Sequence, residues 1–261
     1  MEETPKNILE FCEVVIGYDS NTGRKELIAP FDLASAKAKL IGVLGVNGCG
    51  KSTLLRSLAG LQPLLHGKIL IHGKDVAQCA AQELSKIVSV VLTDRGFSKN
   101  LSVYELVALG RQPYTNWFGK LSIEDHKVID QAFETTSLTD LANTKCHALS
   151  DGQLQRALIA RALAQNTPVV VLDEPTTHLD LHHKAAVLLL LKETAKKKTV
   201  IFSCHDIEMA LHTCDELLIF NDSKLHHGTP DELVHNGLLG RLFSSRHIGF
   251  DEKTRRYFLN H

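Results

Sequence analysis

The stretch of residues 45–53 constrains the fold of this chain more than any other feature of its sequence. It runs Gly-Val-Asn-Gly-Cys-Gly-Lys-Ser-Thr and matches the pattern G-x-x-x-x-G-K-[ST]. Residues 39–44 before it form an apolar run of strand length, and residues 54–59 after it have helical spacing that stops at Gly60. A strand, a glycine-rich turn and a helix start, in this order, predict a loop that wraps around phosphate groups.

The residue types in this loop explain why it would bind phosphate. Glycine carries no Cβ, so backbone N–H groups can converge on phosphate oxygens. The N-terminus of the following helix contributes partial positive charge, Lys51 contributes a full charge, and Ser52 is placed to coordinate Mg²⁺. We therefore expect nucleotide contacts along the whole loop, from Gly45, Val46, Asn47, Gly48, Cys49, Gly50, Lys51, Ser52 and Thr53.

Composition and charge are those of an ordinary globular protein. The 261 residues are 44% hydrophobic and 23% charged, a length near the upper limit for one continuous core. The formal net charge of -1 provides no global basic field that would recruit nucleic acid. No apolar run approaches the roughly 18 residues that span a bilayer, and the polar N-terminus is unlike a signal peptide. The scattered cysteines fit free thiols in a reducing cytosol.

The order of the predicted elements indicates an α/β domain. Residues 11–16 and 26–33 flank a turn signal at 21–23 and predict an opening hairpin. Further apolar runs predict strands, whereas residues 102–164 have helical periodicity. Strands alternating with helices favour a largely parallel sheet, whose ligands lie at the carboxyl ends of the strands. The further predicted strands are 68–74, 87–92, 169–172, 199–203 and 217–220, and a strand–turn–strand tail is expected over 246–261.

Ionisable residues directly follow two of these strands. Asp173 and Glu174 end the buried run 169–172, where two adjacent carboxylates are costly without a metal or a proton partner. In a nucleotide enzyme Asp173 would hold Mg²⁺, and Glu174 would orient and deprotonate water. His205 follows the strand 199–203. We expect all three side chains to meet the phosphate loop at one edge of the sheet.

Two further positions are candidates for nucleotide contacts. Ser150 precedes a run with helical spacing, so it is a natural N-cap whose helix offers a second anion site. Tyr18 is expected on a loop after the first strand, where its ring could either stack on adenine or pack against the protein.

Together these motifs resemble the ATP-binding-cassette (ABC) ATPases. The family's elements occur in its order: the phosphate loop, the signature Leu-Ser-Asp-Gly-Gln at 149–153, the Walker B strand ending in Asp173-Glu174, Thr-His-Leu-Asp at 177–180, and His205. The resemblance spans nearly the whole chain and implies an α/β, P-loop NTPase (RecA-like) core with an antiparallel β subdomain and a helical subdomain insertion. It implies one ABC ATPase domain over 1–261, divided into a core (7–92 and 166–226), a helical subdomain (93–165) and a C-terminal appendage (227–261).

The resemblance also implies a site that two chains share. Two cassettes would pair head to tail as a homodimer and enclose two ATP molecules. Ser150 and Gly152 of one copy, with Gln153 beside them, would close over the γ-phosphate bound by the other. Asp180 would communicate across the dimer.

Within one chain, the resemblance assigns the chemistry to a few side chains. Glu174 would be the catalytic base, and His205 would hold the γ-phosphate and the attacking water. Ser52 and Asp173 would hold Mg²⁺. Tyr18 occupies the family's adenine-stacking position, which favours stacking over simple packing.

Three further stretches of the sequence narrow the resemblance to one group within the ABC family. Asp151 in the signature, residues 175–180 and residues 104–114 are similar to the cassettes of bacterial importers for iron-siderophore, haem or cobalamin. This similarity implies ATP hydrolysis coupled to import, two integral-membrane permease subunits, an indirect substrate-binding protein partner and no nucleic acid. The chain would then lie on the cytoplasmic face of the inner (plasma) membrane, peripheral via the permease.

Two other classes of ATP-using protein are alternatives. A soluble ABC ATPase of nucleic-acid repair or translation usually carries two cassettes, a long coiled-coil insertion or a zinc motif, and the sequence has none of these. A small-molecule kinase is opposed by the signature loop and by the lack of an acceptor-binding lid.

Two positions carry hypotheses of their own. Thr93-Asp94 follows the strand 87–92, where the family usually places Gln, and we expect Thr93 to reach Mg²⁺ through water. Cys49 lies at a helix N-terminus, a setting that lowers a thiol pKa, so oxidation there could block nucleotide binding. The plainer interpretation is a small residue that fits the loop.

Overall fold

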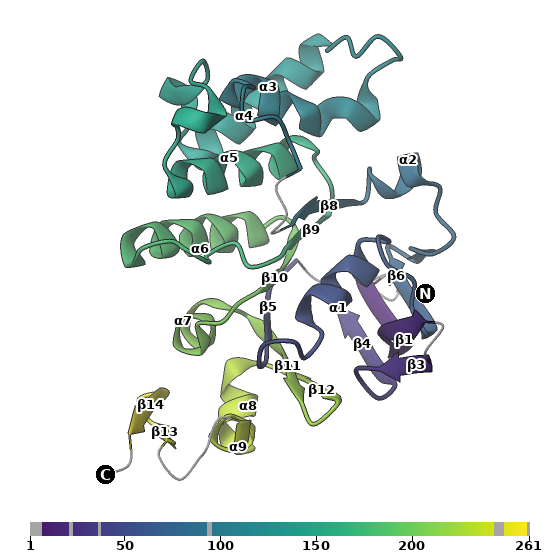
Figure 1. The fold of residues 1–261 in the computed structure, drawn as a ribbon, viewed down its shortest axis with the longest axis vertical. Coiled ribbons are helices and arrows are strands. Elements are labelled where there is room, and N and C mark those ends of the chain that lie inside the picture. The colour runs from purple at the N-terminus through teal and green to yellow at the C-terminus, as the bar shows by residue number, and fades with distance from the viewer. Residues whose placement is uncertain (1–6, 21–22, 36–37, 93–95, 243–247, 260–261) are drawn as a thin grey trace, which may run out of the picture.

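A six-stranded sheet forms the centre of the computed structural model, which describes residues 7–20, 23–35, 38–92, 96–242 and 248–259 (Figure 1). Counted from one edge of the sheet, the first two strands pair antiparallel, and every other pair of neighbouring strands is parallel. This arrangement confirms the predicted largely parallel sheet. The strands lie in the order β12 (Lys224–Gly228), β11 (Glu216–Asn221), β5 (Leu40–Leu44), β10 (Thr199–Ser203), β9 (Val169–Leu172) and β8 (Val88–Val91).

Alternate side chains of these strands enter two separate hydrophobic cores, because successive residues of a strand point to opposite faces. Val169 and Val171 pack in a core with α1 (Lys51–Leu58) and the N-terminal strands. Val170 and Leu172 pack in the other core, to which the longer helices after β8 contribute. Since both faces are covered, inner strands such as β5 and β9 are continuous apolar runs and do not alternate with polar residues.

Antiparallel strands cover the first of these faces. They lie in the order β4 (Phe31–Ser35), β1 (Leu9–Val15), β6 (His66–Ile71) and β7 (Lys74–Asp75). A hairpin follows β1 as predicted, but its strands are β2 (Gly17–Ser20) and β3 (Gly23–Glu26) and not the expected 11–16 and 26–33. Its second strand ends at Glu26, so the expected continuous extension over 26–33 is wrong. Tyr18 was expected on a loop, but it lies on β2 because its backbone pairs with that of Lys25.

Helices between β8 and β9 form one end of the molecule (Figure 1). Each of the three longer helices begins at a serine whose side chain accepts a hydrogen bond from the backbone three residues on, and an acidic or amide side chain completes the capping box. The N-cap predicted at Ser150 is thus confirmed. The helices are α3 (Val103–Ala108), α4 (Ile123–Thr136) and α5 (Asp151–Ala164), with short 3-10 helices at Leu109–Tyr114, Thr139–Leu141 and Cys146–Ala148.

A buried ion pair joins three of these segments. Arg111 Nε donates to Asp125 Oδ1 of α4 at 2.8 Å, and its Nη1 donates to the carbonyl of Ala164, at the end of α5, at 2.8 Å. Hydrogen bonds from Ser122 and the neighbouring Arg111 guanidinium lower the pKa of Asp125 to about 2, although burial acts in the opposite direction. The helical end is therefore held by charge-assisted hydrogen bonds as well as by its core.

The C-terminal half completes the second core and adds a small hairpin. Its helices are α6 (Leu181–Ala195), α7 (Ile207–Thr213), α8 (Pro230–His235) and α9 (Leu238–Leu242); the short α2 (Ala81–Leu84) precedes β8. The predicted strand–turn–strand tail is β13 (Ile248–Asp251) paired with β14 (Arg256–Leu259). Tyr257 of this hairpin is hydrogen-bonded to α7 and α9: its N–H donates to Glu208 Oε1, and its hydroxyl donates to the Leu239 carbonyl. Within the described ranges, no helix is both long and apolar enough to cross a bilayer.

Candidate functional site

Residues that lie far apart in the sequence meet in one cavity of about 590 Å³. The loop after β5, the end of β9 and the end of β10 supply its walls, so the expected convergence at one edge of the sheet is confirmed. Its lining residues are Tyr18, Lys25, Leu27, Asn47, Gly48, Gly50, Lys51, Ser52, Thr53, Glu174, Thr177, His178 and His205.

Glycines set the path of the loop after β5. At Gly45, where φ is 152°, an added Cβ would lie 2.7 Å from Cys49 Sγ and 2.8 Å from the Cβ of Phe220. Gly50 is the N-cap of α1 and has a left-handed φ of 117°, which other residues rarely adopt. The helix therefore starts without a side-chain cap. Its first-turn N–H groups, which have no partner inside a helix, border the cavity and are available to an anion.

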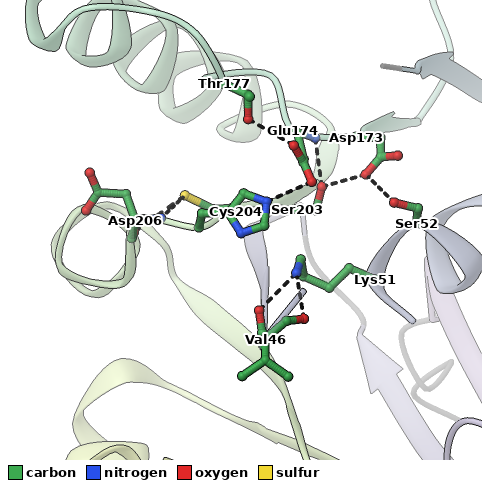
Figure 2. Close-up of polar contacts among 11 residues, drawn as sticks. Val46, Lys51, Ser52, Asp173, Glu174, Thr177, Ser203, Cys204 and Asp206 are labelled. Carbon is green, nitrogen blue, oxygen red and sulfur yellow. Dashed lines mark hydrogen bonds and ion pairs between the residues drawn. The ribbon is translucent and has the colours of Figure 1, made fainter. Parts of the chain in front are cut away.

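The ammonium of Lys51 is held at the loop. Its Nζ donates to the carbonyls of Gly45 at 2.9 Å and Val46 at 3.1 Å (Figure 2). The Lys51 side chain is buried, so its charge is fixed beside the helix start instead of moving in solvent. Backbone N–H groups and one cation at the same place make an anion site.

Asp173 lies opposite the loop and accepts hydrogen bonds from two hydroxyls. Ser52 Oγ donates to its Oδ1 at 3.1 Å, and Ser203 Oγ donates to the same oxygen at 2.7 Å (Figure 2). Ser203 Oγ also accepts from the backbone N–H of Glu174 at 2.7 Å. Ser203 is fully buried at the end of β10, so it fixes both acidic residues to the neighbouring strand. Ser203 was not predicted as a site residue, although one sequence signal marks it: it is a hydroxyl residue that ends an otherwise apolar strand.

Glu174 is held at both carboxylate oxygens. His205 Nε2 donates to Oε1 at 2.7 Å, and Thr177 Oγ1 donates to Oε2 at 3.0 Å. Burial alone would raise the pKa of this carboxyl, but the hydrogen bonds from His205 and Thr177 and the charges of His205 and Lys51 lower it below its ordinary value. The carboxylate is therefore ionised at neutral pH and can accept a proton. Its backbone has a left-handed φ of 51°, a strained conformation for a residue with a side chain.

Tyr18 stands at the rim of the cavity. Its side chain is 51% exposed, and its hydroxyl is hydrogen-bonded to Thr53 Oγ1 at 2.7 Å. Lys25, its partner across the β2–β3 hairpin, lines the same cavity, as do Leu27 and His178. No sequence pattern marks Lys25 and Leu27, because hairpin register brings them there. His178 belongs to the motif at 177–180, and its left-handed backbone turns it toward the cavity.

The signature residues lie away from this cavity. Ser150 Oγ accepts from Gln153 N–H at 3.3 Å, and Gln153 Oε1 accepts from Ser150 N–H at 2.9 Å. Asp180 caps α6 by accepting from His183 N–H at 2.8 Å. In the described part of the chain, neither these residues nor Gly152 line the cavity. One chain therefore does not bring together the whole set of predicted nucleotide contacts.

The thiol pKa of Cys49 can be compared with its prediction, whereas the metal contact of Thr93 cannot. Burial raises the pKa of the Cys49 thiol and outweighs the lowering effects of Lys51 and of backbone hydrogen bonds. The expected low thiol pKa is therefore wrong, because desolvation exceeds the effect of the helix N-terminus. Thr93 and Asp94 lie outside the described residues, so the water-mediated metal contact stays a prediction.

Comparison with known proteins identifies the family. Residues 29–177 match the family model described as ABC transporter, and the chain belongs to this family. It is 36% identical over 225 residues to the probable siderophore transport system ATP-binding protein YusV of Bacillus subtilis (strain 168). The aligned residues cover 85% of this chain and 82% of that protein.

Further relatives extend the similarity over most of the chain. The achromobactin transport ATP-binding protein CbrD of Dickeya dadantii (strain 3937) is 37% identical over 235 residues, or 89% of this chain and 86% of that protein. The structure of cbiO1 from Clostridium perfringens, part of the ABC transporter complex cbiONQ, has a TM-score of 0.75 and 28% identity and covers 91% of this chain and 96% of that chain.

Fold, site and family together define the class of protein. The chain is an ATP-hydrolysing subunit of an ABC transporter of the importer class, with the P-loop NTPase core predicted from its motifs. The alternative of a soluble cassette in nucleic-acid repair or translation is not favoured, because these relatives are named for transport.

Proposed function

We propose that this ATPase drives the import of an iron-siderophore, haem or cobalamin through two integral-membrane permease subunits. A substrate-binding protein would act indirectly, by delivering cargo to the permease. The chain would lie on the cytoplasmic face of the inner membrane, attached through the permease. The relatives named for siderophore and achromobactin transport support this class of cargo. The observation that carries the hydrolytic role is the hydrogen-bonded set of Asp173, Glu174, Ser203 and His205 beside the Lys51 loop.

Phosphate binding would rest on the loop and on a metal ion. Lys51 and the first-turn N–H groups of α1 would contact the phosphates of ATP. Ser52 Oγ and Asp173 Oδ1, 3.1 Å apart, are hydroxyl and carboxylate oxygens, the donors that Mg²⁺ prefers, so the residues present fit this ion. When bound, Mg²⁺ neutralises charge on the phosphates.

The hydrolytic step would use the carboxylate of Glu174. A water molecule beside this carboxylate attacks the γ-phosphorus, and the bond from that phosphorus to the bridging oxygen of ADP breaks. Glu174 takes the proton that the water loses, since its lowered pKa keeps it ionised at neutral pH and an ionised carboxylate can act as a base. His205 orients Glu174 through the 2.7 Å hydrogen bond and lines the same cavity, where it would also contact the γ-phosphate.

The second half of the site would come from another copy of this chain. Ser150, Gly152 and Gln153 lie outside the cavity of their own chain and at the start of α5, where an anion is stabilised. We infer that two copies pair head to tail, so that these residues close over ATP bound by the partner. Asp180 would communicate between the two sites.

Coupling to the permease would pass through the helical end of the molecule. We propose a core of residues 7–92 and 166–226, a helical subdomain of 93–165 and an appendage of 227–261. The contiguous block of helices between β8 and β9 supports this division. A helical subdomain of this kind can rotate against the core as ATP binds.

A substitution of Glu174 tests the mechanism. Glu174→Gln should slow phosphate release by about 10²–10⁴-fold, because the amide cannot act as a general base. ATP binding should persist, and light scattering in saturating ATP should show a stable dimer. Glu193→Gln, on the exposed side of α6, is the matched control and should hydrolyse ATP at the unchanged rate. A Glu174→Gln protein that hydrolyses normally, or that stays monomeric with ATP, would contradict the base or the pairing, respectively.

The cargo is tested in the assembled transporter. The chain is co-purified with its permease, and the complex in vesicles is supplied in turn with haem, a ferric siderophore and cobalamin. Stimulated ATP hydrolysis together with uptake of one of them is expected. Basal hydrolysis with no response to any of the three would refute the proposed cargo class and leave the ATPase assignment standing.

A further inference from the structure

His183, in the first turn of α6, is attached to Asp180 through two of its own atoms. Its backbone N–H donates to Asp180 Oδ1 at 2.8 Å, and its ring Nδ1 donates to the same oxygen at 2.8 Å. The Asp180 side chain is otherwise 66% exposed, so these two bonds are what restrict its orientation in the described structure. They also lower the pKa of the Asp180 carboxyl, chiefly through the backbone hydrogen bond, and keep the carboxylate charged.

The ring of His183 also lies against the signature turn. An ideal Cβ on Gly152 would lie 2.2 Å from His183 Cδ2 and 2.8 Å from its Cγ, far inside van der Waals contact. Gly152 has no left-handed φ that would by itself require glycine. The closeness of the imidazole is therefore the reason within this chain for a glycine at this position.

One imidazole thus touches both segments that the head-to-tail arrangement would present to a second copy. Asp180 belongs to the loop before α6, and Gly152 to the start of α5. Helices held in direct contact move as a unit, because a packed contact has few intermediate arrangements. If the ring were removed, Asp180 would lose a hydrogen bond and the signature turn would lose its neighbour.

We propose that His183 is a positioning residue that fixes Asp180 to the signature turn, so that both reach the partner copy's ATP site in one fixed arrangement. The inference rests on the proposed pairing and adds a residue that the motifs do not include. His183 lies outside the nucleotide cavity of its own chain, so it acts through Asp180 and Gly152 and not through its own ATP.

Substitutions at 183 separate positioning from simple structural support. His183→Ala should lower kcat by about 10- to 100-fold, the effect of misplacing a group by about 1 Å. ATP affinity of the monomer should stay unchanged. His183→Asn should recover most of the rate, because its amide can donate to Asp180 as Nδ1 does. Leu189→Ala, on the exposed side of the same helix, is the control and should stay within about twofold of wild type.

A double substitution tests the contact with Gly152. Gly152→Ala should reduce kcat by at least about tenfold, because its methyl group would overlap the ring. Combining it with His183→Ala removes the overlap, so the two losses should not multiply, and the double variant should be within about twofold of His183→Ala alone. Thermal unfolding of every variant shows whether a loss reflects misfolding.

Some results would overturn the inference. These are a wild-type kcat in His183→Ala, equal losses in His183→Ala and His183→Asn, or a double variant in which the two single losses multiply. ATP-dependent dimerisation of Glu174→Gln, measured in parallel, separates this failure from failure of the proposed pairing. If Glu174→Gln dimerises and the His183 variants behave as wild type, only the role of His183 is wrong. If Glu174→Gln stays monomeric, the pairing itself is wrong.

Discussion

Ser203 offers the sharpest test of how the two acidic residues are held. The change Ser203→Ala deletes one buried hydroxyl and leaves the shape of β10 intact. That hydroxyl donates to Asp173 Oδ1 at 2.7 Å and accepts from Glu174 N–H at 2.7 Å. Alanine can do neither, so the change removes two hydrogen bonds made by a fully buried hydroxyl.

The size of the effect follows from these contacts. Leaving the Glu174 N–H without its acceptor costs about 1–3 kcal/mol, and a hydrogen bond to a charged carboxylate contributes about 1.5–3 kcal/mol. Together these losses are about 2.5–6 kcal/mol, and even the lower end corresponds to a Tm lower by roughly 5–10 °C for a chain of this size. Because the Glu174 backbone is strained at a φ of 51°, loss of this support should also reduce kcat by about tenfold or more.

Thermal unfolding without nucleotide and phosphate release with ATP measure the two effects. Thr199→Val is a matched control on the same strand: Thr199 is fully buried, and its hydroxyl has no hydrogen-bond partner in the described part of the chain. Valine there should leave the Tm unchanged or raise it, because it removes an unsatisfied polar group. If Ser203→Ala lowered the Tm and kcat no more than Thr199→Val does, the bridge between Asp173 and Glu174 would contribute nothing.

Three further predictions concern acid stability, nucleotide affinity and thiol reactivity. The folded-state pKa of Asp125, about 2, lies below the ordinary 3.8, so this group adds about 2 kcal/mol of stability that is present above pH 4 and lost as the pH falls toward 2. Asp125→Asn should flatten that part of the pH dependence in urea unfolding. Tyr18→Ala should raise the Kd for ATP by roughly 2- to 10-fold, because the ring that stacks on adenine is lost. Tyr18→Phe keeps the ring and loses only the hydrogen bond to Thr53, so it should change the Kd less. Equal Kd values for Tyr18→Ala and wild type would exclude stacking. Because its pKa is raised, Cys49 should react with iodoacetamide more slowly than a free thiol at neutral pH, and its rate should increase as the pH rises. Bound ATP should slow the reaction further. Fast labelling at neutral pH would contradict the raised pKa.

Local patterns in the sequence determined much of this protein. The glycine spacing of residues 45–53 specifies a turn that only a few backbone conformations allow, and the structure has that turn. The apolar runs specify buried strands, and Ser150 specifies a helix start, because capping chemistry involves only residues three positions apart. Parallel strands bring their carboxyl ends to one edge, so even the meeting of Glu174 and His205 followed from the order of elements.

Only the tertiary structure decided how these groups support one another. Ser203 bridges Asp173 and Glu174 because β9 and β10 lie in a particular register, which no run of residues records. The contact of His183 with Gly152 depends on the packing of two helices. The pKa of Cys49 was predicted with the wrong sign, because the balance between desolvation and nearby positive charge is set by burial. Motifs that act over a few residues are therefore readable in the sequence, whereas register, helix packing and burial are properties of the folded chain.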